Sequence, residues 1–222
     1  MEKVIVFDVW GQFGHFRKHY TTTSSSTFSF PPRTAIIGMI GAILGIEKHD
    51  INVLKVMMDS WEVGVIILSE VKKIRETINY ISTSSRGGRT QIVLEILKEP
   101  KFRIFVKGHG ALFDRLTESL QKHETVYTPY LGISEFIAAF LYVGAYVEEP
   151  GENIVHSVVR GDTTDVSLED GATYVTERAV RKMGANRAPL EYATYVFRKD
   201  AHPVSIKEGR CVKVGGHPII FL

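Results

Sequence analysis

The order of the strand-like and helix-like apolar segments is the feature of this sequence that most restricts its fold. A β-branched run comes first, followed by a helical segment, two strand-like runs, a second helical segment and an aromatic strand. These segments cover residues 3–9, 33–44, 61–81, 91–97 together with 102–106, 111–124 and 135–147. The order predicts an α+β fold with a ferredoxin-like domain of the RNA-recognition type.

The domain organisation follows from the same segments. We predict a ferredoxin-like domain over residues 1–149 and a small C-terminal β-rich annex over residues 150–222, where short strand-like runs alternate with Gly and Asp turns. Residues of about 70–106 are predicted to form a projecting β-hairpin thumb with a flexible basic tip at residues 82–90. Residues 51–60 are interpreted as a connecting stretch. A chain of 222 residues with 44% hydrophobic content suits one domain with an appendage.

The composition excludes several classes of protein. The sequence has no uncharged apolar run of about 18 residues and does not begin like a signal peptide, so we expect a cytoplasmic protein that does not contact a membrane. Its single cysteine, Cys211, rules out an internal disulfide and a cysteine-based zinc site. We therefore predict no metal and no cofactor.

Charge is distributed unevenly along the chain, although the net charge is only +2. Residues 9–46 contain no Asp or Glu, and residues 71–94 contain five Lys and Arg residues against the single acid Glu76. Acidic residues gather in the second half of the chain instead. Such segregation predicts one face with the positive potential that attracts a phosphate backbone.

A long polar segment between the first strand and the first helix is the main candidate for a binding site. Residues 11–30 combine glycines, aromatic and basic residues and a cluster of hydroxyl side chains at residues 21–27. This composition favours neither a helix nor an ordinary strand, and loops of this length in compact domains usually bind something. The doublet Pro31-Pro32 ends the segment and starts the predicted helix.

The same residues carry a resemblance to a known family. Trp-Gly-Gln-Phe-Gly-His-Phe-Arg-Lys-His-Tyr at 10–20 and Phe-Pro-Pro-Arg-Thr-Ala-Ile-Ile-Gly-Met-Ile-Gly-Ala-Ile-Leu at 30–44 closely resemble the N-terminal signature of the fifth family of CRISPR-associated proteins, which belongs to the RAMP superfamily. Residues 98–106 and 129–136 are also similar to segments of that family. The pattern looks most like members found in type I-B systems.

The resemblance implies an antiviral defence function as a subunit of the Cascade complex. Such a subunit binds the repeat-derived 5′ handle of the guide RNA (crRNA), contacts the backbone and large subunits of the complex, and meets target DNA only indirectly. The residues that could neutralise phosphates or stack on unpaired bases are Phe16, Arg17, Lys18, His19, Tyr20, Arg33, Arg86 and Arg89.

Two alternatives stay open beside this non-catalytic role. Some relatives cut precursor CRISPR RNA without a metal, a reaction that needs a general base and a general acid such as histidine. The residues that could perform such endoribonuclease chemistry are His15, His19, Tyr20, Lys107 and His109. The chain could instead be a protein-interaction module of the complex. The sequence favours the scaffold over the enzyme, because no complete catalytic set matches the cleaving relatives.

Overall fold

The fold is built around its first strand, β1, which is buried on both faces. β1 spans Lys3–Trp10, and its side chains from Val4 to Val9 are buried. Ile5 and Phe7 belong to one hydrophobic core cluster and Val4 to another on the opposite face, since successive side chains of a strand point to opposite sides. The predicted strand at residues 3–9 is confirmed.

This computed structural model describes residues 2–18, 25–47, 49–81, 87–184, 188–207 and 211–222. Its helices are α1 (Arg33–Leu44), α2 (Ile51–Ser60), α3 (Ala111–Lys122) and the short 3-10 helix η1 (Thr163–Asp165). Its strands are β1 (Lys3–Trp10), β2 (Phe13–Gly14), β3 (Glu62–Ile67), β4 (Lys73–Ile81), β5 (Arg89–Lys98), β6 (Lys101–Gly108), β7 (Ala139–Val147), β8 (Glu149–Pro150), β9 (Ile154–Val155), β10 (Val159–Arg160), β11 (Val166–Ser167), β12 (Tyr174–Met183), β13 (Pro189–Arg198), β14 (Val204–Ile206), β15 (Val212–Val214) and β16 (His217–Ile219).

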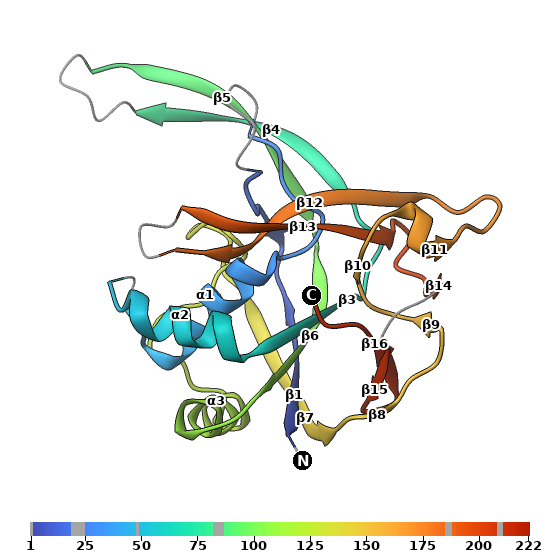
Figure 1. The fold of residues 1–222 in the computed structure, drawn as a ribbon. Coiled ribbons are helices and arrows are strands. Elements are labelled where there is room, and N and C mark those ends of the chain that lie inside the picture. Colours follow the sequence, from blue (N-terminus) through green and yellow to red (C-terminus); the bar gives the residue numbers. More distant parts are fainter. Residues whose placement is uncertain (1, 19–24, 48, 82–86, 185–187, 208–210) are drawn as a thin grey trace.

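Four antiparallel strands in the order β3-β6-β1-β7 form the central sheet (Figure 1). The larger core cluster joins one face of this sheet to α1 and α3, through residues such as Ile36 and Leu116. The smaller cluster joins the opposite face to β15 and β16 through Val214 and Ile219. The molecule is therefore an α+β protein with mostly antiparallel sheets, as predicted.

Local sequence signals set the ends of α1. The Ala35 amide donates to the carbonyl of Pro32 at 2.8 Å, so the fixed backbone of the proline doublet leads directly into the first turn. At the other end Gly45 has a φ of 73°, the left-handed conformation that stops a helix and favours glycine. The predicted helix at residues 33–44 is confirmed at both ends.

Two predicted segments have a different structure. Residues 51–60 form the helix α2 rather than a connection, with Met57 buried and Leu54 packed against the core. The expected long strand at residues 61–81 is two strands, β3 and β4, which belong to different sheets. Strand propensity alone could not locate the break at residues 68–72, because the backbone there bonds to distant segments: Val71 donates to the carbonyl of Lys199.

The projecting hairpin consists of β4 and β5 only, so it is shorter than the predicted thumb at residues 70–106. β4 and β5 pair along their whole length and extend away from the central sheet (Figure 1). Residues 102–106, predicted to belong to the hairpin, lie in β6 of the central sheet because Phe102, Ile104 and Val106 are buried in its core. The tip residues 82–86 lie outside the described residues.

The chain after residue 150 is rich in short strands and contributes to the same core as the rest of the molecule. β12 and β13 form its longest hairpin, and α1 contacts β12. The ring of Phe30, just before α1, packs edge-on against Tyr195 and Phe197 of β13, with ring centroids 5.5 Å apart in both pairs. The predicted division at residue 149 therefore separates two sequence segments that share one hydrophobic core.

We expect Gly38→Ala to raise the free energy of unfolding by about 0.5–1 kcal/mol, because glycine in a helix loses more backbone entropy on folding than alanine does. Gly38 lies in α1, and a Cβ there would meet nothing within 4 Å. Urea denaturation measures the effect. Gly41→Ala is the matched control, since its Cβ would lie 3.1 Å from Leu54 Cδ2. An equal gain in both variants would contradict this account.

Candidate nucleic-acid interface

The polar segment between β1 and α1 is ordered at both of its ends, where the chain doubles back and the two ends bond to each other. The Lys18 amide donates to the carbonyl of Ser26 at 2.9 Å, and a β-bridge joins Arg17 to Thr27. The two arms therefore run antiparallel to each other, and we call residues 15–18 and 25–29 the loop stem. Of the predicted RNA contacts, His19, Tyr20 and Arg86 lie outside the described residues.

His15 fastens the loop stem to the hairpin. Its Nδ1 lies 2.7 Å from the carbonyl oxygen of Glu95 on β5, and its Nε2 lies 3.0 Å from the hydroxyl of Ser25. The simplest arrangement has Nδ1–H donating to the carbonyl and Nε2 accepting from the hydroxyl, which requires a neutral ring. Burial lowers the pKa of His15, in agreement with this. His15 is 2% exposed and has a structural position, not that of an accessible general base.

The anchoring by His15 should weaken as the pH falls. A histidine whose pKa is lower in the folded than in the unfolded state contributes stability above pH 6.5, and this stability is lost as the pH decreases below that value. We expect wild-type protein to lose more stability than His15→Asn between about pH 7.5 and about pH 5.5, because Asn retains a donor for Glu95 but does not titrate. Urea denaturation at the two pH values tests this. Equal losses would contradict it.

Glu177 of β12 joins three parts of the molecule at one buried carboxylate. Its side chain accepts the amide of Ser29 at 2.8 Å and the Ser29 hydroxyl at 3.1 Å. Lys18 Nζ lies 2.9 Å and Lys73 Nζ 3.4 Å from the same carboxylate, which is 2% exposed. Glu177 therefore holds the loop stem, the base of the hairpin and the C-terminal segment together, and sequence reasoning did not identify it.

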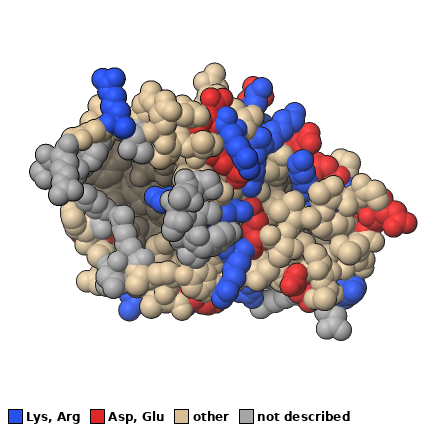
Figure 2. Space-filling view, turned by 90° about the horizontal axis from the view of Figure 1, so that it is seen from above, with Lys and Arg blue, Asp and Glu red and all other residues tan. Residues whose placement is uncertain are grey.

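Two arginines on one face of the hairpin form no salt bridge to a described residue, although Glu95 lies opposite Arg75 in the strand register. Arg75 and Arg89 are exposed, and the cross-strand register places both on the face that also carries Lys73. Lys73 points toward Glu177 and the carbonyl of Thr27, so this face is directed toward the loop stem. Arg17 is exposed on the loop stem itself. Seen from this side, the molecule has a hollow, with lysine and arginine side chains beside it among acidic ones (Figure 2).

Two predicted RNA contacts are buried instead. Phe16 is 3% exposed and packs against Phe102 of β6, so its ring has no free face for a base. Arg33 is also 3% exposed, and its guanidinium donates to the carbonyls of Met58 at 2.5 Å and Trp61 at 2.6 Å. These carbonyls are at the C-terminal end of α2, where a cation is favoured. Both residues thus have structural positions in this chain.

The three residues considered for RNA cleavage that the structure describes, His15, Lys107 and His109, do not form one site. Lys107 is near the start of β1, because Val4 is its β-pairing partner, whereas His15 follows the far end of that strand. Strand length alone separates these ends by roughly 20 Å. His109 is exposed and lies 3.3 Å from Glu2 at the Lys107 end.

The charge of Lys107 is also fixed. Its Nζ lies 3.1 Å from Glu148, 3.2 Å from Glu62 and 3.5 Å from Glu2. Burial lowers the pKa of Lys107, but the carboxylates of Glu148 and Glu62 outweigh this and raise it above its ordinary value. The side chain is therefore protonated at neutral pH and does not act as a base there.

The part of the chain that the structure describes contains no group of three or more metal-ligating side chains.

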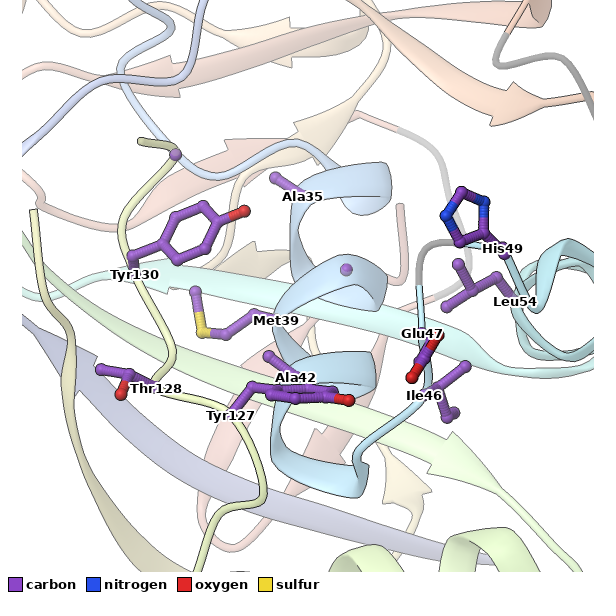
Figure 3. A pocket seen from close by; sticks show the side chains of 12 residues that line it. Ala35, Met39, Ala42, Ile46, Glu47, His49, Leu54, Tyr127, Thr128 and Tyr130 are labelled. Atoms are coloured by element: carbon purple, nitrogen blue, oxygen red, sulfur yellow. The ribbon is translucent and has the colours of Figure 1, made fainter. Parts of the chain in front are cut away.

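A separate groove of about 540 Å³ lies between α1, the start of α2 and residues 127–132. Figure 3 shows Tyr127 and Tyr130 facing Met39 and the small residues of α1, with Glu47 at one end. None of its described lining residues is a lysine or arginine. This groove is therefore chemically unlike the basic side of the molecule.

Comparison with known families assigns the chain. A family model described as CRISPR-associated protein (Cas_Cas5) matches residues 4–203. The chain belongs to this family. The family predicted from the motifs at residues 10–20 and 30–44 is thus confirmed, and the type I-B subtype stays a prediction. A search of curated proteins found no match.

Solved structures with the same fold come from CRISPR proteins. A CRISPR protein from Archaeoglobus fulgidus matches with a TM-score of 0.59 and 15% identity, covering 99% of both chains. A chain of a CRISPR RNA-guided surveillance complex matches with a TM-score of 0.55 and 14% identity, covering 98% of this chain and 91% of that one. A chain of the Type III-B Cmr-beta complex bound to cognate target RNA matches with a TM-score of 0.51 and 11% identity, over 91% and 86%. At these identities the likeness concerns the fold of this Cas_Cas5 family member.

No helix within the described ranges is long and apolar enough to cross a membrane.

Proposed function

We propose that this Cas_Cas5 family member is a non-catalytic subunit of a CRISPR type I (Cascade) effector complex that binds the repeat-derived 5′ handle of the guide RNA. The observation that carries the proposal is the set of exposed arginines on the loop stem and the hairpin, Arg17, Arg75 and Arg89, which form no salt bridge to a described residue and lie on the segments that Glu177 joins. Exposed arginines without carboxylate partners can neutralise phosphates at little desolvation cost. Membership in the family supports crRNA as the nucleic acid.

The fold is consistent with this function. The strand order β3-β6-β1-β7, with helices after β1 and after β6, supports assigning the central sheet to the ferredoxin-like class of RNA-recognition folds. β4 and β5 are an insertion between β3 and β6 in this assignment, and they form the thumb. The annex over residues 150–222 would support the thumb through β12.

The burial of some side chains changes the set of residues that we propose to contact RNA. Arg17 and Arg89 stay as phosphate contacts, and Arg75 is added because it shares the hairpin face with Arg89. Lys18 lies at the edge of the site, where its bond to Glu177 orients it. Phe16 and Arg33 shape the site from within the core. His19, Tyr20 and Arg86 remain proposed contacts on sequence grounds alone.

An endoribonuclease role is not supported by a specific arrangement of the described residues. The two candidate groups are at opposite ends of β1, His15 is buried with both ring nitrogens bonded, and Lys107 is held protonated. The backbone and large subunits of the complex are the proposed protein partners, and contact with target DNA would be indirect.

Purified protein incubated with end-labelled repeat RNA and a chelator tests the proposal. We expect a shifted band on a native gel and intact RNA on a denaturing gel. An RNA cut at a defined position, with cleavage lost in His19→Ala, would identify an enzyme instead. Absence of any shift at low salt would refute guide-RNA binding by the free chain.

A further inference from the structure

The edge strand β7 is long, apolar and open along its outer side. β7 is nine residues long, ends the central sheet beside β1 and contains no charged residue and no proline. Within the described ranges, no backbone hydrogen bond reaches its outer side. Leu141 is 55% exposed, Val147 is 44% exposed, and Ile137 just before the strand is 64% exposed. Proteins usually protect such an edge with charges, prolines or bulges, since its unpaired N–H and C=O groups can pair with another chain. β7 has a bulge at Val143 but no charge and no proline.

The other edge strand of the same sheet, β3, is covered by segments of this same chain. On the outer side of β3, the Val158 amide donates to the carbonyl of Val65 at 2.8 Å, and the Leu222 amide donates to the carbonyl of Val63 at 2.8 Å. A β-bridge also joins Ile66 to Ser157. Segments of the C-terminal half thus close one edge, and β7 has no equivalent cover in the part of the chain that the structure describes.

Charge around β7 determines which kind of molecule could cover it. Residues 123–159 contain five glutamates and no lysine or arginine. Of the glutamates beside β7, Glu148 is paired with Lys107, and Glu149 and Glu135 are exposed. The glutamates favour a basic peptide over a phosphate backbone at this end of the sheet, and an uncharged peptide would meet no repulsion.

We propose that β7 binds an extended segment of a neighbouring protein subunit, which adds a fifth strand to the central sheet. The open row of backbone groups selects an extended chain, because only a strand can satisfy them in sequence. The segment carries apolar side chains opposite Leu141 and Val147 and is neutral or basic at its ends. This inference rests on the proposed function, since the partner is another subunit of the same complex.

Amide hydrogen exchange tests the proposal directly. The chain is tagged and purified both alone and in the complex that assembles on it in its native cells, and the complex is measured before and after ribonuclease treatment. We expect the amides of residues 139–147 to exchange at least about tenfold more slowly in the complex, and to stay protected after RNA digestion. Equal exchange in the free and assembled protein would overturn the proposal. Loss of protection with the RNA would do so as well.

Substitutions identify the occupant. Leu141→Lys places a charge on the exposed edge without touching the core, and we expect it to reduce recovery of the other subunits by about tenfold or more. Val56→Lys, at an exposed position of α2 with 62% exposure, is the control and should leave recovery unchanged. A free chain that is dimeric, and that Leu141→Lys makes monomeric, would show a second copy on β7 and refute the proposal. The proposed function is judged separately, because Leu141→Lys should leave the RNA gel shift of the free chain unchanged.

Discussion

Replacing Glu177 with glutamine should lower the free energy of unfolding by about 2–3 kcal/mol, since removing one partner of a buried ion pair leaves the other uncompensated. The glutamine amide can accept with only one of its two ends. Either the Ser29 amide or the lysines would face an NH2 group instead of an oxygen. Lys18 and Lys73 are 16% and 25% exposed, so water replaces part of the lost interaction and the effect is below that of a fully buried pair.

Thermal denaturation should show this as a decrease in Tm of about 5–10 °C for a chain of this size. Amide exchange should increase at residues 25–29, which Glu177 fastens to the hairpin base. The matched control is Glu76→Gln, an exposed glutamate on β4 without a salt bridge to any described residue, which should change stability by less than about 0.5 kcal/mol. If Glu177→Gln were as stable as this control, the carboxylate would not be the junction that we describe.

Reversing two exposed arginines should weaken repeat-RNA binding by about 10- to 100-fold. Arg17→Glu removes a positive charge from the loop stem, and Arg75→Glu removes one from the facing side of the hairpin. Neither side chain forms a salt bridge in the described structure, but Arg75→Glu places a second carboxylate opposite Glu95, so thermal denaturation must first show that the variant is folded. If each arginine neutralises one phosphate, the slope of log K against log salt should decrease in magnitude by about 1.4, as expected for single-stranded nucleic acid.

Binding titrations at several salt concentrations measure both effects. The control variant Lys55→Glu with Lys122→Glu produces the same change in net charge on α2 and α3, outside the hairpin and the loop stem. Its affinity should fall much less. Equal losses in the two double variants would mean that the RNA responds to overall charge alone, and the assignment of the site to the hairpin and loop stem would then be wrong.

Elements with local signals were predictable from the sequence. The helix at residues 33–44 is bounded by a proline doublet and by Gly45, and both act within one turn of the helix end. α2 also has a local signal that the prediction of a connecting stretch missed: Ile51, Leu54 and Met58 are spaced like one face of a helix. The break between β3 and β4 had no local signal, since bonds to residues far away in the chain produce it.

The candidate site was predictable in its location and less so in its residues. Basic and aromatic residues at 16–20 directed attention to the loop, and their residue types are suited to RNA, so the RNA-binding role of the loop stays a prediction. Burial, however, depends on tertiary packing, so the sequence could not separate the exposed Arg17 from the buried Arg33. The role of Glu177 could not be predicted for the same reason. Glu177 is 148 residues from Ser29 in the sequence, and an acidic residue in a strand-like run gives no indication of its partner.

The register of β1 has a consequence for how the chain is made. β1 leaves the ribosome well before β6 and β7, with which it pairs; its partner for Lys3 on β6 is Gly108. A strand with four consecutive apolar core residues, Val4 to Phe7, must therefore remain unpaired during synthesis until its distant partners emerge. Sheets that depend on such non-local pairing fold slowly and expose apolar surface on the way. Nascent chains of this protein should accordingly depend on chaperones that shield the first ten residues, and truncations that end before β6 should aggregate.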